Sequence, residues 1–215
     1  MRVAGIVLCG GRSSRMGRPK AWLPFGGETL LQRTVRTLSE AAHPVVVVAA
    51  PGQDVPSLPT TVRIVRDEVE DRGPLGGLAA GLAALEGLAD AAYRSACDVP
   101  SLTPAFVRAV LSFLASESSL SDPGRCPGLR LWRAFSLQDT GFDPEGVTQP
   151  QPRPPAWVCE PRPSLGGLTP PARPEIAVPH VGDHYHPLAA AYRLSVLPHV
   201  RELLAEATEV GFVGV

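Results

Sequence analysis

The chain has 215 residues, of which 44% are hydrophobic, and its 20 basic and 21 acidic residues give a formal net charge of −1. This balance argues against a general nucleic-acid binder, which carries an excess of basic residues. No apolar run approaches the roughly 18 residues that a membrane-spanning helix needs. The composition therefore indicates a globular protein with one large domain or two small ones.

Two residue counts are unusual. The chain has 24 prolines, and 12 of them lie within residues 120–174. The basic residues are 19 arginines and a single lysine, Lys20. Because lysine carries a compact point charge that arginine does not provide, Lys20 is a candidate for a specific role. A general preference for arginine codons would also leave an isolated lysine.

The cysteines and the N-terminus indicate the cellular compartment. Cys9, Cys97, Cys126 and Cys159 show neither a CxxC spacing nor the pattern of a small secreted domain. The chain enters an apolar strand pattern directly after Met1-Arg2, whereas a signal peptide needs a longer apolar core and a small-residue cleavage site. A reduced, cytoplasmic protein is therefore expected.

Strand and helix patterns alternate along the first 116 residues. Apolar runs predict strands over residues 3–8, 45–50, 62–65 and 92–97. Apolar residues at helical spacing predict helices over residues 29–42, 78–88 and 103–114. Such alternation is typical of an α/β fold in which helices connect parallel strands. Residues 1–116 are therefore expected to form one α/β unit.

Residues 117–174 differ from the segments on either side. Prolines at this density interrupt helices and central strands, so a Pro-rich, disordered insertion with polyproline-like stretches is predicted. Order is predicted to resume with strands over residues 175–179 and 187–192, around a turn at Gly182-Asp183, and with a helix over residues 196–207. Residues 175–215 are interpreted as the remainder of the same α/β domain.

The segment most typical of a binding site follows the first strand. Four cations lie there within nine residues, with no acid among them: Arg12, Arg15, Arg18 and Lys20. Glycines let backbone N–H groups approach a ligand, and consecutive amides can form an anion-binding nest. Since open α/β sheets bind ligands at the carboxyl ends of their strands, the pattern favours a polyphosphate. Neither GxxxxGK[ST] nor GxGxxG is present, and an ordinary basic surface loop is the alternative.

Carboxylates follow two later strands. Asp98 comes directly after residues 92–97 and could bind Mg²⁺, which prefers one or two carboxylates together with phosphate oxygens. The alternative is an aspartate that caps the turn before the next helix. The acidic residues 67–71 follow another strand and precede Gly73-Pro74-Leu75-Gly76. A carboxylate there could accept hydrogen bonds from the N1–H and 2-amino group of guanine, while the alternative is a solvated acidic surface.

Taken together and in this order, the three motifs resemble the nucleotidyltransferases of molybdenum cofactor assembly, in particular the molybdenum cofactor guanylyltransferases. The motifs are LxGGxSxRMGxxK, D…GPLxG and CDxPxL, and the resemblance covers residues 3–116, returning more weakly over residues 183–204. It implies a Rossmann-like three-layer α/β fold with a mostly parallel sheet, interrupted here by the Pro-rich insertion.

The resemblance also implies a reaction. GMP is transferred from GTP to molybdenum-molybdopterin, with Mg²⁺ as cofactor and pyrophosphate as the leaving group. The implied partners are these two substrates and the maturation proteins of molybdoenzymes, with neither nucleic acid nor membrane among them. Residues 1–116 would then be the nucleotide-binding part of the domain.

The resemblance assigns residues to the nucleotide site from three segments of the chain: Leu8, Cys9, Gly10, Gly11, Ser13, Lys20, Asp67 and Asp98. The first three would hold the nucleotide through backbone groups. Gly11 favours guanine, since the related cytidylyltransferases have AAG in place of GG. Lys20 would contact the phosphates and, with Arg15, offset the charge that develops on pyrophosphate. Asp67 would help to bind the nucleotide, and Asp98 would bind Mg²⁺.

The sequence departs from the family's pattern in two further places. The family's asparagine after the second strand is absent from Val47-Val48-Ala49-Ala50. The family's closing NxNTPxD-like segment is absent after Glu209, so the domain is expected to be truncated at its C-terminus. These departures keep other functions open: a cytidylyl- or sugar-nucleotide transferase on the same fold, an inactive nucleotide-binding remnant, or an adaptor whose Pro-rich segment recruits a partner.

Two other groups of residues are interpreted without a catalytic role. Cys9 and Cys97 stand at strand ends and are interpreted as small packing residues rather than nucleophiles. His184-Tyr185-His186 would place two histidines on one face of a strand, but no nearby cysteine or glutamate completes a metal site. The resemblance instead places this segment near the acceptor substrate.

Overall fold

The computed structural model describes residues 1–10, 19–67, 73–115, 129–132, 175–181 and 184–209. Its main sheet has the strand order β5-β4-β1-β6-β10-β8-β7, with β9 beside β8. Four neighbouring strands run parallel: β1 (Val3–Leu8), β4 (Val45–Ala49), β5 (Val62–Arg66) and β6 (Ala91–Ala96). The other strands form antiparallel pairs: β7 (Leu129–Trp132), β8 (Ile176–Val181), β9 (His184–Tyr185) and β10 (Ala191–Arg193).

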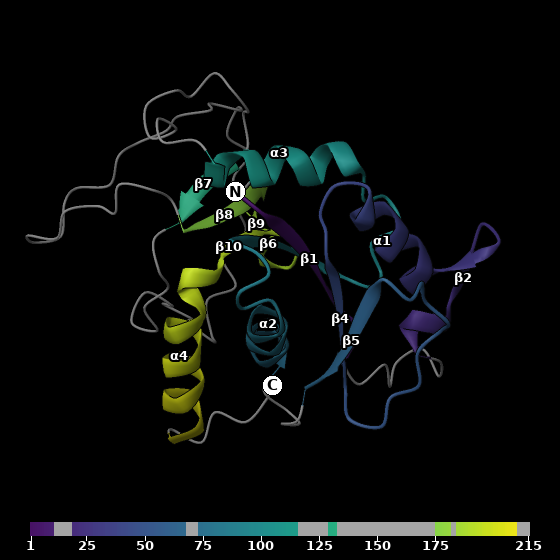
Figure 1. Cartoon of the computed structure of the whole chain (residues 1–215), viewed down its shortest axis with the longest axis horizontal. Coiled ribbons are helices and arrows are strands. Elements are labelled where there is room, and N and C mark those ends of the chain that lie inside the picture. The colour runs from purple at the N-terminus through teal and green to yellow at the C-terminus, as the bar shows by residue number, and fades with distance from the viewer. Residues whose placement is uncertain (11–18, 68–72, 116–128, 133–174, 182–183, 210–215) are drawn as a thin grey trace, which may run out of the picture.

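Helices cover both faces of this sheet (Figure 1). One face is covered by α1 (Leu30–Ser39) and α3 (Pro104–Ala115), and the other by α2 (Gly73–Ala84) and α4 (Leu197–Glu209). Because β4 is buried along its whole length between these layers, its sequence is a continuous apolar run. The expected three-layer α/β architecture with a mostly parallel sheet is confirmed.

The start of α1 shows how the sequence defines an element. The Thr29 hydroxyl accepts a hydrogen bond from the Gln32 N–H at 3.2 Å, and the Gln32 side chain accepts one from the Thr29 N–H at 2.9 Å. This reciprocal capping box satisfies two N–H groups that a helix start otherwise leaves without partners. The helix then buries Leu31, Val35 and Leu38 against the sheet.

Several element boundaries differ from the sequence predictions. The helix predicted over residues 78–88 begins earlier, at Gly73, and ends at Ala84. The strand predicted over residues 187–192 starts instead with a 3₁₀ turn, η3 (Pro187–Ala189), and only Ala191–Arg193 forms β10. A proline at the first helical position favours that turn, because its φ is already helical and it needs no N–H partner.

A short hairpin and a helical turn had no predicted counterpart. The hairpin pairs β2 (Pro24–Phe25) with β3 (Glu28–Thr29). Gly26 and Gly27 connect them with φ of 59° and 89°, the conformation that two-residue hairpin turns require and glycine adopts at low cost. The turn is the 3₁₀ helix η1 (Lys20–Trp22).

Within the predicted insertion, the structure describes only β7, which lies at the end of the sheet beside β8. An end position is compatible with flanking prolines, because one side of such a strand needs no hydrogen-bond partner. The rest of residues 117–174 lies outside the described residues, so the disordered insertion stays a prediction. No helix in the described ranges is both long and apolar enough to cross a membrane.

Candidate active site at the carboxyl ends of the parallel strands

The ends of β1, β4 and β6 lie side by side and bring the glycine turn next to Asp98. Leu8 is aligned with Val48 of β4 and with Ala96 of β6. The Cys9 N–H donates to the Val48 carbonyl at 2.8 Å, and the Cys97 N–H donates to the Leu8 carbonyl at 3.0 Å. The parallel pairing therefore continues one residue past β1 and β6, up to the residues that precede Gly10 and Asp98.

Lys20 and Asp98 form an ion pair at this edge. The Lys20 Nζ lies 2.6 Å from Asp98 Oδ2, although 78 residues separate them in the sequence. Lys20 is the first residue of η1, which is anchored by the buried Ala21 and by a hydrogen bond from the Trp22 indole to the Asp54 carbonyl. The hydrogen bond to the Asp98 carboxylate, together with its charge, raises the pKa of Lys20.

This ion pair is accessible to solvent, with 46% of the Lys20 side chain and 32% of the Asp98 side chain exposed. An exposed ion pair contributes at most about 1 kcal/mol to stability. A phosphate or a cation can therefore replace either partner at little cost in folding free energy. The single lysine of the chain thus lies beside the carboxylate that follows β6.

Asp67 lies at the end of β5, where its N–H donates to the Ala49 carbonyl at 3.0 Å. It contributes to the wall of a cavity of about 490 Å³ between β5, α2 and α4, together with Arg63, Arg66 and Gly76. Neither Lys20 nor Asp98 lines this cavity. The structure therefore places Asp67 on the same sheet edge as the ion pair, but two strands away from β1.

The start of α2 packs closely on the end of β1. A Cβ added to Gly77 would lie 3.1 Å from Leu8 Cδ2, and one added to Gly81 would lie 2.7 Å from Ile6 Cγ2. Gly73, with φ of +60°, begins the helix in a conformation that glycine adopts readily. Gly77 and Gly81 therefore allow α2 to approach the strand that leads to the candidate site.

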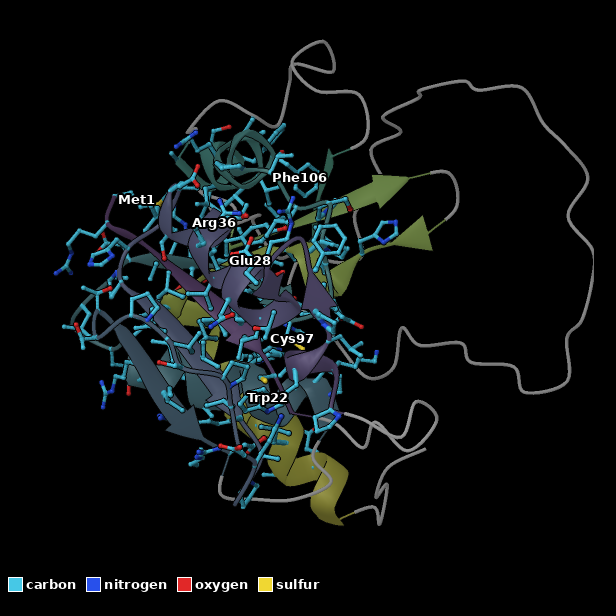
Figure 2. All side chains as sticks on the ribbon, turned by 90° about the vertical axis from the view of Figure 1, so that its right-hand side faces the viewer. Met1, Trp22, Glu28, Arg36, Cys97 and Phe106 are labelled. Atoms are coloured by element: carbon cyan, nitrogen blue, oxygen red, sulfur yellow. The ribbon has the colours of Figure 1, made fainter. Side chains whose placement is uncertain are left out.

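Cys9 and Cys97 are buried in the core beside α1 and α3, and neither forms a disulfide. A hydrogen bond to Cys9 and burial raise the pKa of the Cys97 thiol. Such a thiol is a poor nucleophile, because the thiolate is the reactive form. This agrees with the interpretation of Cys97 as a packing residue. In Figure 2, Cys97 can be found on the same side of the molecule as Trp22.

The remaining predicted site residues are placed as follows. Leu8 is the last residue of β1, Cys9 follows it, and Gly10 is exposed directly after Cys9. Gly11, Ser13 and Arg15 lie outside the described residues, so their roles stay predictions. Among the described residues, no three histidine, cysteine, aspartate or glutamate side chains are close enough to share a metal ion.

Several side chains that the sequence did not single out form hydrogen bonds to the backbone at the carboxyl ends of β1 and β6. The Thr34 hydroxyl shares its proton between the Leu30 carbonyl at 2.9 Å and the Cys97 carbonyl at 3.2 Å. Arg33 Nε donates to the Pro100 carbonyl at 2.9 Å. Gln53 donates to the Cys9 carbonyl at 3.0 Å. No local pattern identifies these residues, because each one contacts a segment at least 44 positions away.

Comparison with known proteins identifies the family. A protein-family model with the description "MobA-like NTP transferase domain" matches residues 5–127 of this chain. The chain belongs to this family. The match covers most of β1, the whole of β4, β5 and β6, and both segments of the Lys20–Asp98 ion pair. It confirms the resemblance that the motifs indicated.

Relatives carry a more specific name. A probable molybdenum cofactor guanylyltransferase from Mycolicibacterium paratuberculosis is 45% identical over 122 residues, which cover 55% of this chain and 60% of that protein. One from Mycobacterium tuberculosis is 47% identical over 104 residues, which cover 47% of this chain and 51% of that protein. The chain thus spans little more than half the length of these relatives.

Solved structures support the fold over more of the chain. A molybdopterin-guanine dinucleotide biosynthesis protein A from Archaeoglobus fulgidus matches with a TM-score of 0.50 and 14% identity, over 95% of this chain and 74% of that one. A putative protein from Aquifex aeolicus matches with a TM-score of 0.51 and 16% identity, over 98% and 83% of the two chains. At these identities the likeness concerns the fold alone.

Proposed function

We propose that this member of the MobA-like family transfers GMP from GTP to molybdenum-molybdopterin, forming the guanine dinucleotide cofactor and releasing pyrophosphate. The observation that carries the proposal is the 2.6 Å contact between Lys20, the first residue of η1, and Asp98, which follows β6. It joins the one lysine of the chain to a carboxylate, in a fold whose relatives are named guanylyltransferases.

The reaction is a displacement at the α-phosphorus of GTP. The terminal phosphate oxygen of the acceptor forms a bond to this phosphorus while the bond to the β-phosphate oxygen breaks, and pyrophosphate leaves. Such a step depends on alignment and charge neutralisation more than on covalent help from the protein. In this proposal Lys20 turns from Asp98 to the polyphosphate, and Arg15 adds a second positive charge.

Asp98 fits the requirements of a divalent cation. Its carboxylate is partly exposed, and Mg²⁺ typically takes one or two protein carboxylates and completes its shell with water and phosphate oxygens. A site with a single carboxylate is therefore suited to a metal that arrives with a nucleotide. Bound there, Mg²⁺ would supply positive charge to the phosphates.

The nucleotide would extend from this ion pair along the sheet edge. In the proposal, Gly10 begins the turn that donates backbone N–H groups, with Gly11 and Ser13 in the same segment. Leu8 and Cys9 complete the backbone part of the site. Asp67, at the end of β5, would accept hydrogen bonds from the guanine edge.

Calorimetric titration with GTP and with CTP, with and without Mg²⁺, tests the proposal. We expect GTP to bind more tightly than CTP, and only with Mg²⁺ present. Asp98→Asn and Lys20→Met should lower GMP transfer by about 10²-fold or more, because each removes a charge that stabilises the transition state. Asp90→Asn is the matched control, because Asp90 pairs with Arg2 in a similarly exposed ion pair just before β6 begins.

Three results would contradict the proposal in different ways. Tighter binding of CTP would indicate the cytidylyltransferase alternative. Tight GTP binding without any transfer would indicate an inactive remnant. Full GMP transfer by the Asp98→Asn variant would show that the Asp98 carboxylate has no role in the reaction.

A further inference from the structure

Gln53 connects the end of β4 to the end of β1. Its half-buried side chain donates from Nε2 to the Cys9 carbonyl at 3.0 Å, with the Cys9 Sγ at 3.4 Å. The same side chain accepts a hydrogen bond from the Ala50 N–H, at 3.0 Å from Oε1. Both ends of the amide are therefore used within the protein.

The backbone of Gln53 is itself held in place. Its N–H donates to the Ala50 carbonyl at 3.2 Å. Arg66, the last residue of β5, donates to the Ala50 carbonyl at 3.2 Å and to the Gln53 carbonyl at 2.5 Å. The turn after β4 is thus fixed from β5, while the Gln53 side chain reaches across to β1.

This arrangement has a consequence for Gly10. The Cys9 carbonyl and the Gly10 N–H belong to one planar trans peptide group, in which they point in opposite directions. The Cys9 N–H is already bonded to the Val48 carbonyl, and Gln53 takes the Cys9 carbonyl. The Gly10 N–H therefore points away from Gln53.

We infer that Gln53 is a positioning residue that sets the orientation of the Cys9–Gly10 peptide and so presents the Gly10 N–H to the bound nucleotide. This inference rests on the proposed function. Gln53 does not touch the nucleotide, since its donor and its acceptor are both engaged by Cys9 and Ala50. It lowers the cost of ordering the first amide of the glycine turn before the ligand binds.

Two variants at this position test the inference. Gln53→Glu keeps the length of the side chain but replaces the donor with an acceptor, which repels the Cys9 carbonyl. Gln53→Met removes both hydrogen bonds. The matched control is Gln32→Met, because Gln32 is also half-buried and also makes two hydrogen bonds to the backbone, to Thr29 and to Ser57.

We expect both Gln53 variants to weaken GTP binding about tenfold, the effect of one lost hydrogen bond of ordinary strength. The KM for GTP should rise by the same factor while kcat changes little. Gln32→Met should lower the melting temperature by a similar amount to Gln53→Met and leave the Kd for GTP unchanged. This difference between the two glutamines separates positioning from general stabilisation.

The outcomes are distinguishable. If the wild-type protein binds GTP and the Gln53 variants bind it equally well, the positioning role is overturned and the proposed function stands. If the Gln32 and Gln53 variants weaken binding equally, the effect is one of stability and the positioning role is likewise overturned. If the wild-type protein binds no nucleotide, the proposed function fails first and the inference with it.

Discussion

Replacing Tyr93 with phenylalanine is expected to stabilise the protein. Tyr93 lies on β6 and is completely buried. Its hydroxyl has no hydrogen-bond partner in the part of the chain that the structure describes. A buried polar group without a partner costs about 1–3 kcal/mol of folding free energy. Tyr93→Phe removes this group and keeps the aromatic ring in place.

The expected gain is smaller than the full cost of the hydroxyl. The oxygen occupies space in the core, so its removal leaves a small void that offsets part of the gain. We therefore expect the free energy of unfolding to rise by about 1 kcal/mol. In a domain of this size, that corresponds to an increase in melting temperature of about 2–4 °C.

The same substitution should change the pH dependence of stability. Burial raises the pKa of the Tyr93 hydroxyl above its ordinary value of 10.0. In the unfolded chain the hydroxyl ionises near 10, whereas in the folded protein it stays protonated. The wild-type protein therefore loses stability as the pH rises above about 10. Tyr93→Phe should lose less over the same range.

Tyr192→Phe is the matched comparison for thermal or urea denaturation at pH 7 and at pH 10.5. The Tyr192 hydroxyl is hydrogen-bonded to the buried Arg94 guanidinium, whose Nε already lacks a partner among the described residues. Its removal should destabilise the protein by about 1–3 kcal/mol. Removal of a tyrosine hydroxyl should therefore raise the free energy of unfolding at Tyr93 and lower it at Tyr192, which lies on the other face of the sheet. Destabilisation by Tyr93→Phe at pH 7 would refute the reasoning.

Three further substitutions have expected outcomes. Thr29→Ala removes the cap of α1 and should lower the free energy of unfolding by about 1 kcal/mol, measured by urea denaturation. Gly81→Ala gains about 1 kcal/mol of helix propensity but places a Cβ 2.7 Å from the buried Ile6 side chain, which costs about 1–3 kcal/mol. A lower melting temperature is therefore expected, and a higher one would show that α2 can shift. The hydrogen bond from Arg36 lowers the pKa of Glu28 below its ordinary 4.5, so the Tm difference between wild type and Glu28→Gln should be present above pH 4.5 and vanish as the pH falls below it.

The architecture could be predicted from the sequence because buried parallel strands and amphipathic helices have different periodicities. The apolar run of β4 and the capping pair of α1 are local signals, and both elements begin at or within one residue of their predicted starts. The helix α1 ends at Ser39, three residues before its predicted end. The early start of α2 at Gly73 was missed because a helix rich in glycine has weak intrinsic propensity. Packing of Gly77 and Gly81 against β1 stabilises it instead.

The candidate site also contains both residues that the sequence predicted and residues that it did not. Lys20 was recognisable as the single lysine of a cation-rich glycine segment, and Asp67 and Asp98 as carboxylates that follow predicted strands. The order of these three motifs also matches a known family. By contrast, Gln53 has no signal of its own, since a glutamine after Pro51-Gly52 reads as an ordinary turn residue. Its importance comes from the Cys9 carbonyl, 44 positions away.

By itself, the sequence determined the layered fold, the strand after which each charged residue stands, and the family. Only the tertiary structure decided that Lys20 pairs with Asp98 and that Gln53 holds the peptide before Gly10. The physical reason is that periodicity and capping act within a few residues, whereas the order and register of the strands determine which chain ends meet. That register is set by the packing of both helical layers on the whole sheet, which no local pattern contains.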